Sequence, residues 1–389
     1  MSMVDIKVSQ IATGKKLEVD IYDPKTGAKV LSKDTMITKE YKEKLEKLGI
    51  SYINITREDK TLNSELKSEF IQGMNEFVEE LFEENIKEIP KSLRKSSSNI
   101  TSVINRRPQL HVDLTEYFNT DAYLKMIRIA QFAVNVAKIY NRKITALFRA
   151  RINTATEEGA KRYKEYLKKA LIDLREISLA AVLSSIGSVC KDKKENLEFI
   201  KNKKAVIQYL KKECPGIDDK CFEEYDENYL SVYSFCLLSG KNVSLDLKKM
   251  VLLSNEGEKK EHGILQANEQ FVNSLNKAQY GAKIIKLCSV YDEELKKVIK
   301  EKMPLEHVTA ALDYYASIGI INPQLLEMLL GNIKLYPEYT KVELSDGKGW
   351  VREGLVIESP VGRANASRPK VRVSGGEVID LSEEPSILI

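Results

Sequence analysis

The sequence is poor in the residues that carry most enzyme chemistry. Its 389 residues include three histidines, one tryptophan and five cysteines. No two histidines lie four positions apart, as paired metal ligands on a helix do, and no two cysteines have CxxC spacing. The patterns GxxxxGK[ST], GxGxxG and GxSxG are also absent. The sequence therefore marks no metal pair, no nucleotide-binding loop and no nucleophile with its base.

Long apolar runs are lacking as well. No stretch approaches the roughly 18 apolar residues of a membrane span, and the first residues do not join a basic region to an apolar one. The scattered cysteines are typical of reduced thiols in the cytoplasm, so we expect a cytoplasmic protein without a membrane partner. The formal net charge of +4 is small for this length, so we predict no nucleic-acid partner.

The periodicity of apolar residues predicts an α+β fold that is predominantly α. Residues 1–57 form a predicted small N-terminal α+β domain. Thr38 is its expected helix N-cap and Gly49 its expected helix end. Strands are predicted at 17–22, 28–31 and 51–55, where apolar and polar residues alternate or turn residues intervene.

Residues 58–110 are predicted to be a linker helix region. The stretch from Leu62 to Ile89 is amphipathic and rich in Glu and Lys, with apolar residues three and four positions apart. It predicts either a helix that packs within the chain or one half of a helical dimer seam. The segment Ser96–Ser102 is polar and predicts a break before the next domain.

Residues 111–335 read as helices joined by short connections, which predicts a bundle. The expected helices are 122–140, 144–155, 158–186, 196–210, 227–238, 245–253, 269–291, 292–302, 307–318 and 323–330. The final segment, 336–389, predicts a short β-rich tail folded as an antiparallel sheet, because its alternating runs are separated by glycine-containing turns.

The order of these elements resembles the HD-GYP proteins, a branch of the HD superfamily that hydrolyses cyclic di-GMP with two or three metal ions. The N-terminal pieces that carry the resemblance are Asp20–Pro24, Val30–Thr35 and Leu45–Ile50. The C-terminal pieces are Leu335–Pro337, Val342–Gly347, Arg368–Pro369 and Ile379–Leu381. The resemblance implies that residues 111–335 form an HD-type helical bundle.

The resemblance also locates the metal ligands of the family, and this chain has none of them. The family motif Leu-His-Asp-Ile-Gly-Lys corresponds to Leu183–Ser188, which reads Leu-Ser-Ser-Ile-Gly-Ser. The expected ligand positions are occupied by Ile127, Ser184, Ser185, Asn228, Ser254, Asn255 and Ser289. A neutral serine hydroxyl supplies neither carboxylate charge nor an imidazole nitrogen. We therefore expect no catalytic residues, no metal, no cofactor and no hydrolysis by this mechanism.

Three functions remain open. The first is a catalytically inactive signalling or scaffold protein that binds a protein partner or forms a homodimer, with the helix at Leu62–Ile89 as a candidate contact. The second is an effector that binds cyclic di-GMP without hydrolysis, for which Arg128 and Tyr123 are the candidate ligand-binding residues. The third is a phosphodiesterase with a relocated site, assembled from His111, Glu256, His262 and Asp292.

Overall fold

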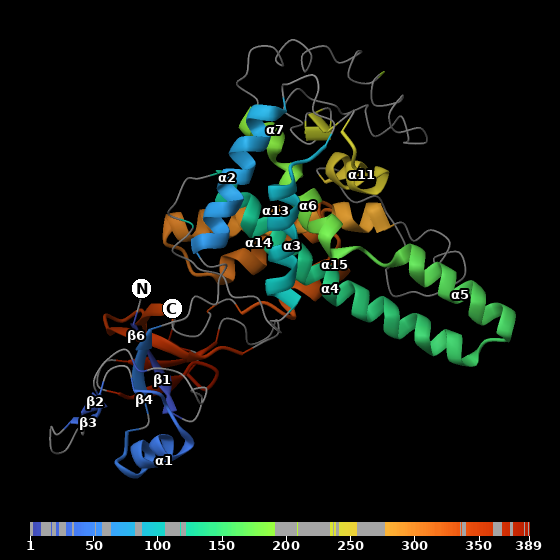
Figure 1. Ribbon diagram of the computed structural model, residues 1–389. Helices are drawn as coiled ribbons and strands as arrows, with labels where there is room; N and C mark the ends of the chain where they lie inside the picture. Colours follow the sequence, from blue (N-terminus) through green and yellow to red (C-terminus); the bar gives the residue numbers. More distant parts are fainter. Residues whose placement is uncertain are drawn as a thin grey trace. The chain divides into compact units, whose positions relative to one another are not determined.

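The computed structural model divides the chain into two compact units. The structure describes residues 3–8, 17, 21–22, 29–32, 35–50, 52–56, 64–81, 88–105, 117, 122–190, 208, 234–235, 237–238, 241–254, 277–334, 336, 340–360, 368–373, 376–384, 386–387 and 389. The first unit comprises residues 1–61, 337–358 and 370–389, so the predicted N-terminal domain and most of the β-rich tail fall together (Figure 1). The second comprises 62–336 and 359–369.

The second unit is helical. Its helices are α2 (Ser64–Glu80), α3 (Lys91–Asn105), α4 (Ala122–Thr154), α5 (Glu157–Ala170), α6 (Leu174–Ser184), α7 (Ile186–Cys190), α11 (Leu245–Leu253), α13 (Lys277–Glu301), α14 (Glu306–Ser317) and α15 (Pro323–Leu330). The start of several helices follows from local chemistry. Asp173 caps α6, Ser244 caps α11, and Asn322 caps α15 with Pro323 in its first turn.

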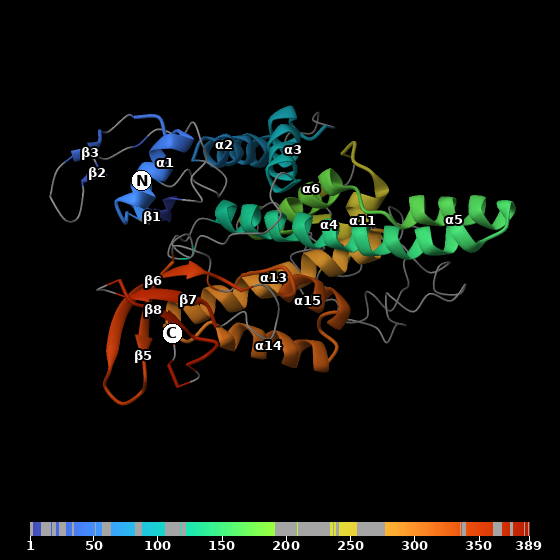
Figure 2. The same cartoon turned by 90° about the horizontal axis from the view of Figure 1, so that it is seen from below.

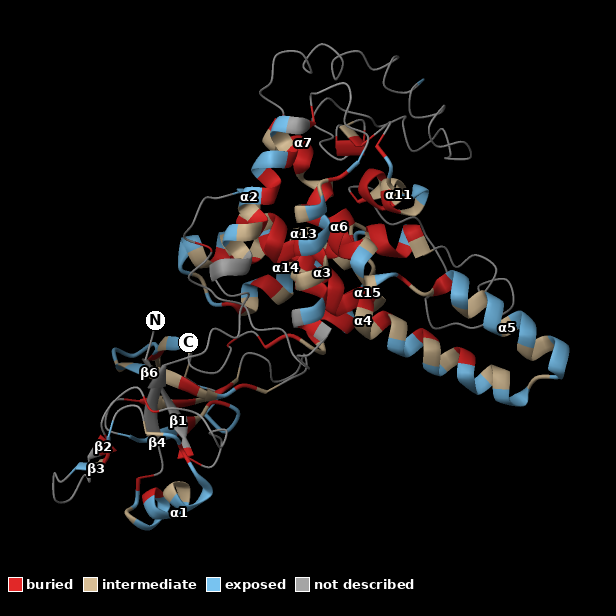
Figure 3. Ribbon diagram, viewed as in Figure 1, coloured by how far each residue is buried: buried red, intermediate tan, exposed pale blue. Residues whose placement is uncertain are grey.

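The core of this unit is built around α4, which packs against α3, α5, α6, α13 and α15. The N-terminal half of α4 is buried on nearly every side, as Figure 3 shows. Small residues such as Ala130, Ala133 and Ala137 allow its neighbours to approach closely. Helix α6 is lined in the same way by Ala180 and Ala181, and α11 packs against both α6 and α13. Four helices, α4, α6, α11 and α13, therefore enclose one apolar centre.

The first unit contains the strands. Strand β1 (Met3–Lys7) pairs with β4 (Tyr52–Thr56), and β2 (Ile21–Tyr22) pairs with β3 (Lys29–Leu31), both antiparallel. Helix α1 (Lys39–Lys47) is capped by Thr38 and followed by Gly49 at φ 75°, a left-handed conformation that suits glycine. Strands β5 (Lys341–Ser345), β6 (Val351–Glu358), β7 (Lys370–Val373) and β8 (Val378–Asp380) form an antiparallel sheet in chain order.

The predicted fold class, α+β and predominantly α, is confirmed, but several boundaries were wrong. The predicted helices 122–140 and 144–155 are one helix, α4, and Asp292 lies inside α13 rather than at a helix start. The predicted helix 158–186 is divided at 171–173, between α5 and α6. The predicted polar break at Ser96–Ser102 lies inside α3. Strand β1 was not predicted. Most of the predicted helices 196–210 and 227–238 lies outside the described residues.

The packing of helix α2 distinguishes between the two predictions for the stretch Leu62–Ile89, which were a helix that packs within the chain and one half of a dimer seam. Its apolar stripe, formed by Phe70, Met74 and Phe77, is at most 1% exposed inside the helical unit, where α2 packs on α3 and α4. The interpretation as a helix that packs within the chain is therefore confirmed, and the stripe is not available as a dimer seam. The outward positions of α2 are polar and include Gln72, Asn75 and Glu76. Among the described residues, no helix is long and apolar enough to cross a membrane.

Candidate functional site

The helices that hold the predicted ligand positions pack against one another. Ile127 lies in α4, Ser184 ends α6, Ser254 follows α11, and Ser289 lies in α13. Each of these helices contacts at least two of the other three. The four helices that carry these positions are therefore neighbours in the bundle. Asn228 and Asn255 lie outside the described residues.

At three of these positions the side chain packs or hydrogen-bonds within its own helical unit. Ile127 is 2% exposed and belongs to the apolar core. The hydroxyl of Ser184 donates a hydrogen bond to the Ala181 carbonyl at 2.8 Å, and that of Ser254 donates to the Val251 carbonyl at 2.8 Å. Both bonds run back along the helix that carries the serine, as serine side chains near helix ends commonly do. They satisfy local backbone carbonyls.

The segment Leu183–Ser188 forms a break between two helices. Helix α6 ends at Ser184, Ser185 is the cap, and α7 begins at Ile186, so the turn lies at Ser185. The buried hydroxyl of Ser234 hydrogen-bonds to the backbone on both sides of this break. It donates to the Ser184 carbonyl at 2.9 Å and accepts from the Gly187 N–H at 2.9 Å. One hydroxyl thus satisfies two backbone groups that the break leaves without helical partners.

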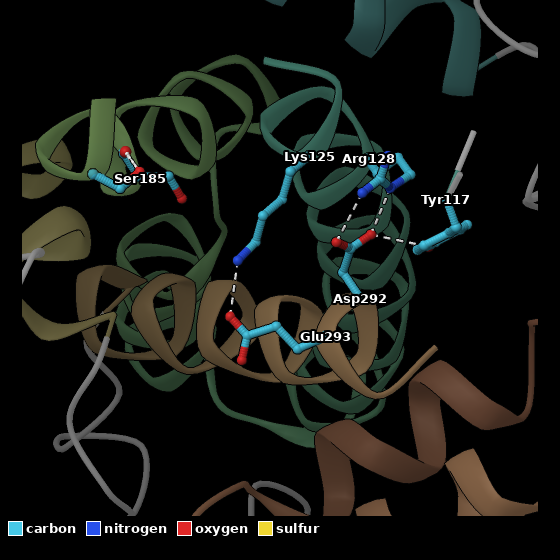
Figure 4. A network of polar contacts seen from close by, with 7 residues as sticks. Tyr117, Lys125, Arg128, Ser185, Asp292 and Glu293 are labelled. Atoms are coloured by element: carbon cyan, nitrogen blue, oxygen red, sulfur yellow. Dashed lines mark hydrogen bonds and ion pairs between the residues drawn. The ribbon is translucent and has the colours of Figure 1, made fainter. Parts of the chain in front are cut away.

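A buried ion pair joins α4 to α13 in the same bundle. Arg128 donates from Nε to Oδ1 of Asp292 at 2.7 Å and from Nη2 to Oδ2 at 3.1 Å (Figure 4). The two side chains are 4% and 0% exposed. The Tyr117 hydroxyl donates to Oδ1 of Asp292 at 2.9 Å, and its ring lies 4.2 Å from the guanidinium carbon of Arg128. A two-bond pair of this kind fixes both the distance and the rotation of the helices.

The electrostatics of this cluster keep Tyr117 protonated. Burial raises the pKa of Tyr117 well above its usual value, and the negative charge of Asp292 raises it further. The phenol therefore stays a hydrogen-bond donor to the carboxylate at any physiological pH. One turn before Arg128, Lys125 pairs with Glu293 at 2.8 Å, but this second contact is half-exposed and weak by comparison.

The candidate ligand-binding residues have different surroundings. Arg128 directs two nitrogens at Asp292, so an anion could bind them only by displacing a buried carboxylate. Tyr123 lies in the first turn of α4 and is half-buried. Of the residues considered for a relocated catalytic site, Asp292 is engaged in the ion pair, whereas His111, Glu256 and His262 lie outside the described residues. Within the described ranges, no three His, Cys, Asp or Glu side chains form a group that could hold a metal ion.

A pocket of about 470 Å³ opens elsewhere in the helical unit, beside α3 and the first turns of α6 and α11. Arg94 and Arg175 line it, together with Glu176, Ser97 and Asn242. Arg94 donates to the Asn242 carbonyl at 3.0 Å, which ties α3 to the segment before α11. The sequence did not reveal this pocket, because its two arginines lie on different helices, 81 positions apart, and share no motif.

The chain was compared with protein-family models, with curated proteins and with solved structures, and none of them matches. The resemblance to the HD-GYP proteins therefore stays a prediction that rests on the order of motifs in the sequence.

The ion pair predicts a stability difference between two neighbouring carboxylates. Asp292→Asn leaves the Arg128 charge buried without its partner, so we expect a loss of about 3–5 kcal/mol in the free energy of unfolding. Glu293→Gln makes the same chemical change at an exposed position, and we expect less than about 1 kcal/mol. Urea denaturation followed by circular dichroism at 222 nm measures both, because that signal reports the helices.

A paired replacement separates the ion pair from simple packing. Arg128→Met with Asp292→Leu removes both charges and keeps apolar volume, so we expect it to recover most of the stability that Asp292→Asn loses. Equal, small effects of Asp292→Asn and Glu293→Gln would contradict the structural role assigned to the pair.

Proposed function

We propose that the chain is a catalytically inactive HD-GYP-like signalling or scaffold protein of the cytoplasm that acts through protein–protein contacts. The observation that carries this proposal is the Arg128–Asp292 ion pair. Arg128 directly follows the family's first ligand position, Ile127, and Asp292 lies one helical turn after Ser289. Arg128 and Asp292, which lie close to these two positions in the sequence, therefore bind each other.

The serines support the same interpretation. A hydroxyl that donates to a carbonyl of its own helix presents no charge to a cation, and the neutral serine is a poor ligand for the hard metals used in phosphate chemistry. The helical body remains intact around these substitutions, since α4, α6, α11 and α13 enclose a well-filled apolar centre. A body that keeps its fold without its ligands still offers surfaces to partners.

The contact surface that the structure favours lies on α14. Tyr314 and Ile318, the C-cap residue of α14, are 60% and 51% exposed and lie about one helical turn apart in the sequence. Tyr315 lies beside Tyr314 with ring centroids 5.9 Å apart. Exposed aromatic and aliphatic side chains that lie together are typical anchors of protein interfaces. We propose a homodimer or a protein partner at this surface.

Substitution at α14 tests the contact. If the purified chain self-associates through this surface, Tyr314→Ser with Ile318→Ser removes the apolar anchors and weakens association at least about tenfold. Leu245→Ser is the matched control, because Leu245 is 47% exposed on α11, away from this surface. Sedimentation velocity over a concentration series measures the change. A monomer at every concentration, or the same loss in the control, would count against a homodimer at α14.

The alternative is an effector that binds cyclic di-GMP, and the pocket beside α3 favours it. Arg94 and Arg175 are cations that suit phosphate oxygens, and Ser98 supplies a hydroxyl at the same wall. Glu176 also lines the pocket and reduces its positive potential. Like the main proposal, this alternative predicts no hydrolysis of cyclic di-GMP. It differs because the chain would bind cyclic di-GMP rather than act only through protein contacts.

Calorimetric titration with cyclic di-GMP, with and without Mn²⁺, distinguishes the two. The alternative predicts saturable heat without metal, and a loss of affinity of about tenfold or more in Arg94→Gln with Arg175→Gln, since each removes a charge-assisted hydrogen bond. Lys95→Gln is the matched control, because Lys95 adjoins Arg94 but does not line the pocket. Absence of heat in both conditions would leave the protein-contact proposal alone.

A further inference from the structure

A helical arm extends from the bundle. The second half of α4, from Asn141 to Thr154, continues beyond the buried core, and α5 returns antiparallel beside it (Figure 2). Both views show this hairpin reaching past the other helices of the unit. At about 1.5 Å per residue, the arm is about 20 Å long. A thin seam holds it together, in which Phe148 meets Tyr163 with ring centroids 6.3 Å apart.

The arm carries more positive charge than the whole chain. Residues 141–171 contain nine lysines and arginines but three glutamates, a net charge of +6. The formal net charge of the chain is +4, so everything outside the arm sums to −2. Eight of the nine cations are exposed. The absence of a nucleic-acid partner was predicted from the net charge of the whole chain. That net charge does not show that the positive charge is concentrated on the arm.

The few carboxylates of the arm serve its own helices. Glu157 and Glu158 occupy the first turn of α5, where they favour the positive end of the helix dipole. Glu157 also pairs with Lys161 at 3.5 Å, an exposed contact four residues along. Among the described residues, no ion pair involves Arg142, Arg149, Arg162 or Lys169. Where the arm leaves the bundle, burial lowers the pKa of Lys138, and the nearby Arg142 lowers it further.

The spacing of the cations suits a repeating anion. Arg142 and Arg149 are seven residues apart on one face of α4, and Arg162 and Lys169 are seven residues apart on one face of α5. Two helical turns correspond to about 10 Å. Along one strand of a duplex, phosphates follow one another about every 3.4 Å of the axis, so each pair spans about three phosphates.

The surface of the arm favours nucleic acid over protein or membrane. In the described part of the chain, none of the large exposed hydrophobic side chains lies on the arm; they are Met36, Leu245, Tyr314, Ile318, Val351 and Val378. The cores of protein interfaces are rich in aromatic residues and poor in lysine. Helices that lie on membranes also need an apolar face. A surface of exposed cations without apolar anchors matches the phosphate backbone, which is bound mainly through charge.

We propose that the α4–α5 arm is a binding surface for the phosphate backbone of nucleic acid, independent of base sequence. This proposal does not depend on the loss of catalysis in the bundle or on the contact at α14. Because the α14 surface lies outside the arm, the chain could hold a protein partner and a nucleic acid at separate places.

Fluorescence anisotropy with the full chain tests the proposal. The probes are a labelled duplex DNA of about 20 base pairs and a labelled single-stranded RNA of the same length, at about 50 to 200 mM salt. If four phosphates are contacted, log K falls with log salt at a slope of about −4, which weakens binding roughly a hundredfold over this range. Sequence-scrambled probes should bind equally well.

Variants locate the binding surface. Arg142→Gln, Arg149→Gln, Arg162→Gln and Lys169→Gln together should weaken binding at least about tenfold and flatten the salt slope by about one for each phosphate that is no longer neutralised. The matched control is Lys39→Gln, Lys44→Gln, Lys297→Gln and Lys300→Gln, which removes the same charge from positions outside the arm. Circular dichroism confirms that each variant keeps its helices.

Either of two results would overturn the proposal. One is no binding of either probe at about 50 mM salt, where charge-driven contacts are strongest. The other is equal weakening by the arm variant and its control, which would assign any binding to the total charge of the chain. In the first case, a salt-sensitive protein complex that depends on the arm would show that the arm binds an acidic protein instead.

Discussion

The buried ion pair between Arg128 and Asp292 is the constraint around which the helical unit is arranged. A charged side chain that is almost fully buried is tolerated only when its partner is fixed in place. Here the Arg128 and Asp292 side chains are 4% and 0% exposed, and two nitrogens of Arg128 donate to the two carboxylate oxygens of Asp292. The pair holds α4 against α13, and Tyr117 closes the cluster from a segment before α4. The neighbouring contact between Phe132 and Tyr291, with ring centroids 5.0 Å apart, continues the same interface by apolar packing. The other helices lie around this interface, since α6 packs on α4 and α11 packs on α6 and α13.

The helical unit separates its charges by location. Inside the bundle, Arg128 and Asp292 match one positive with one negative charge, and the hydroxyls at Ser184 and Ser254 donate to backbone carbonyls. On the arm, cations outnumber carboxylates by six, and most of them face solvent. An interior of matched charges keeps a fold specific, whereas an unmatched exposed surface is suited to a partner. Matched polar groups therefore lie inside the helical unit, and the features suited to partners lie at its edges.

Local chemistry made much of the fold predictable. Thr38 was predicted to start a helix because its side chain can satisfy a free N–H group, and Gly49 was predicted to end it because glycine readily adopts a positive φ. The failures involve distant partners. Ser97 and Thr101 predicted a break in α3, but they are buried and bond to the carbonyls of Arg175 and Leu174. The sequence placed Arg128 near the expected site, but its partner is 164 positions away, and no periodicity reveals that pairing. The net charge of the whole chain did not reveal the positive arm, because the rest of the chain is net negative.

The central proposal is that the bundle does not perform metal-dependent hydrolysis, because the described residues at the expected ligand positions are an isoleucine and neutral serines. The most direct test is turnover of cyclic di-GMP by the purified full chain after incubation with Mn²⁺ and with Fe²⁺, beside a catalytically active HD-GYP protein as positive control. We predict no linear or mononucleotide product above the level without protein. Multiple turnovers that depend on added metal, with about two ions bound per chain, would contradict this claim.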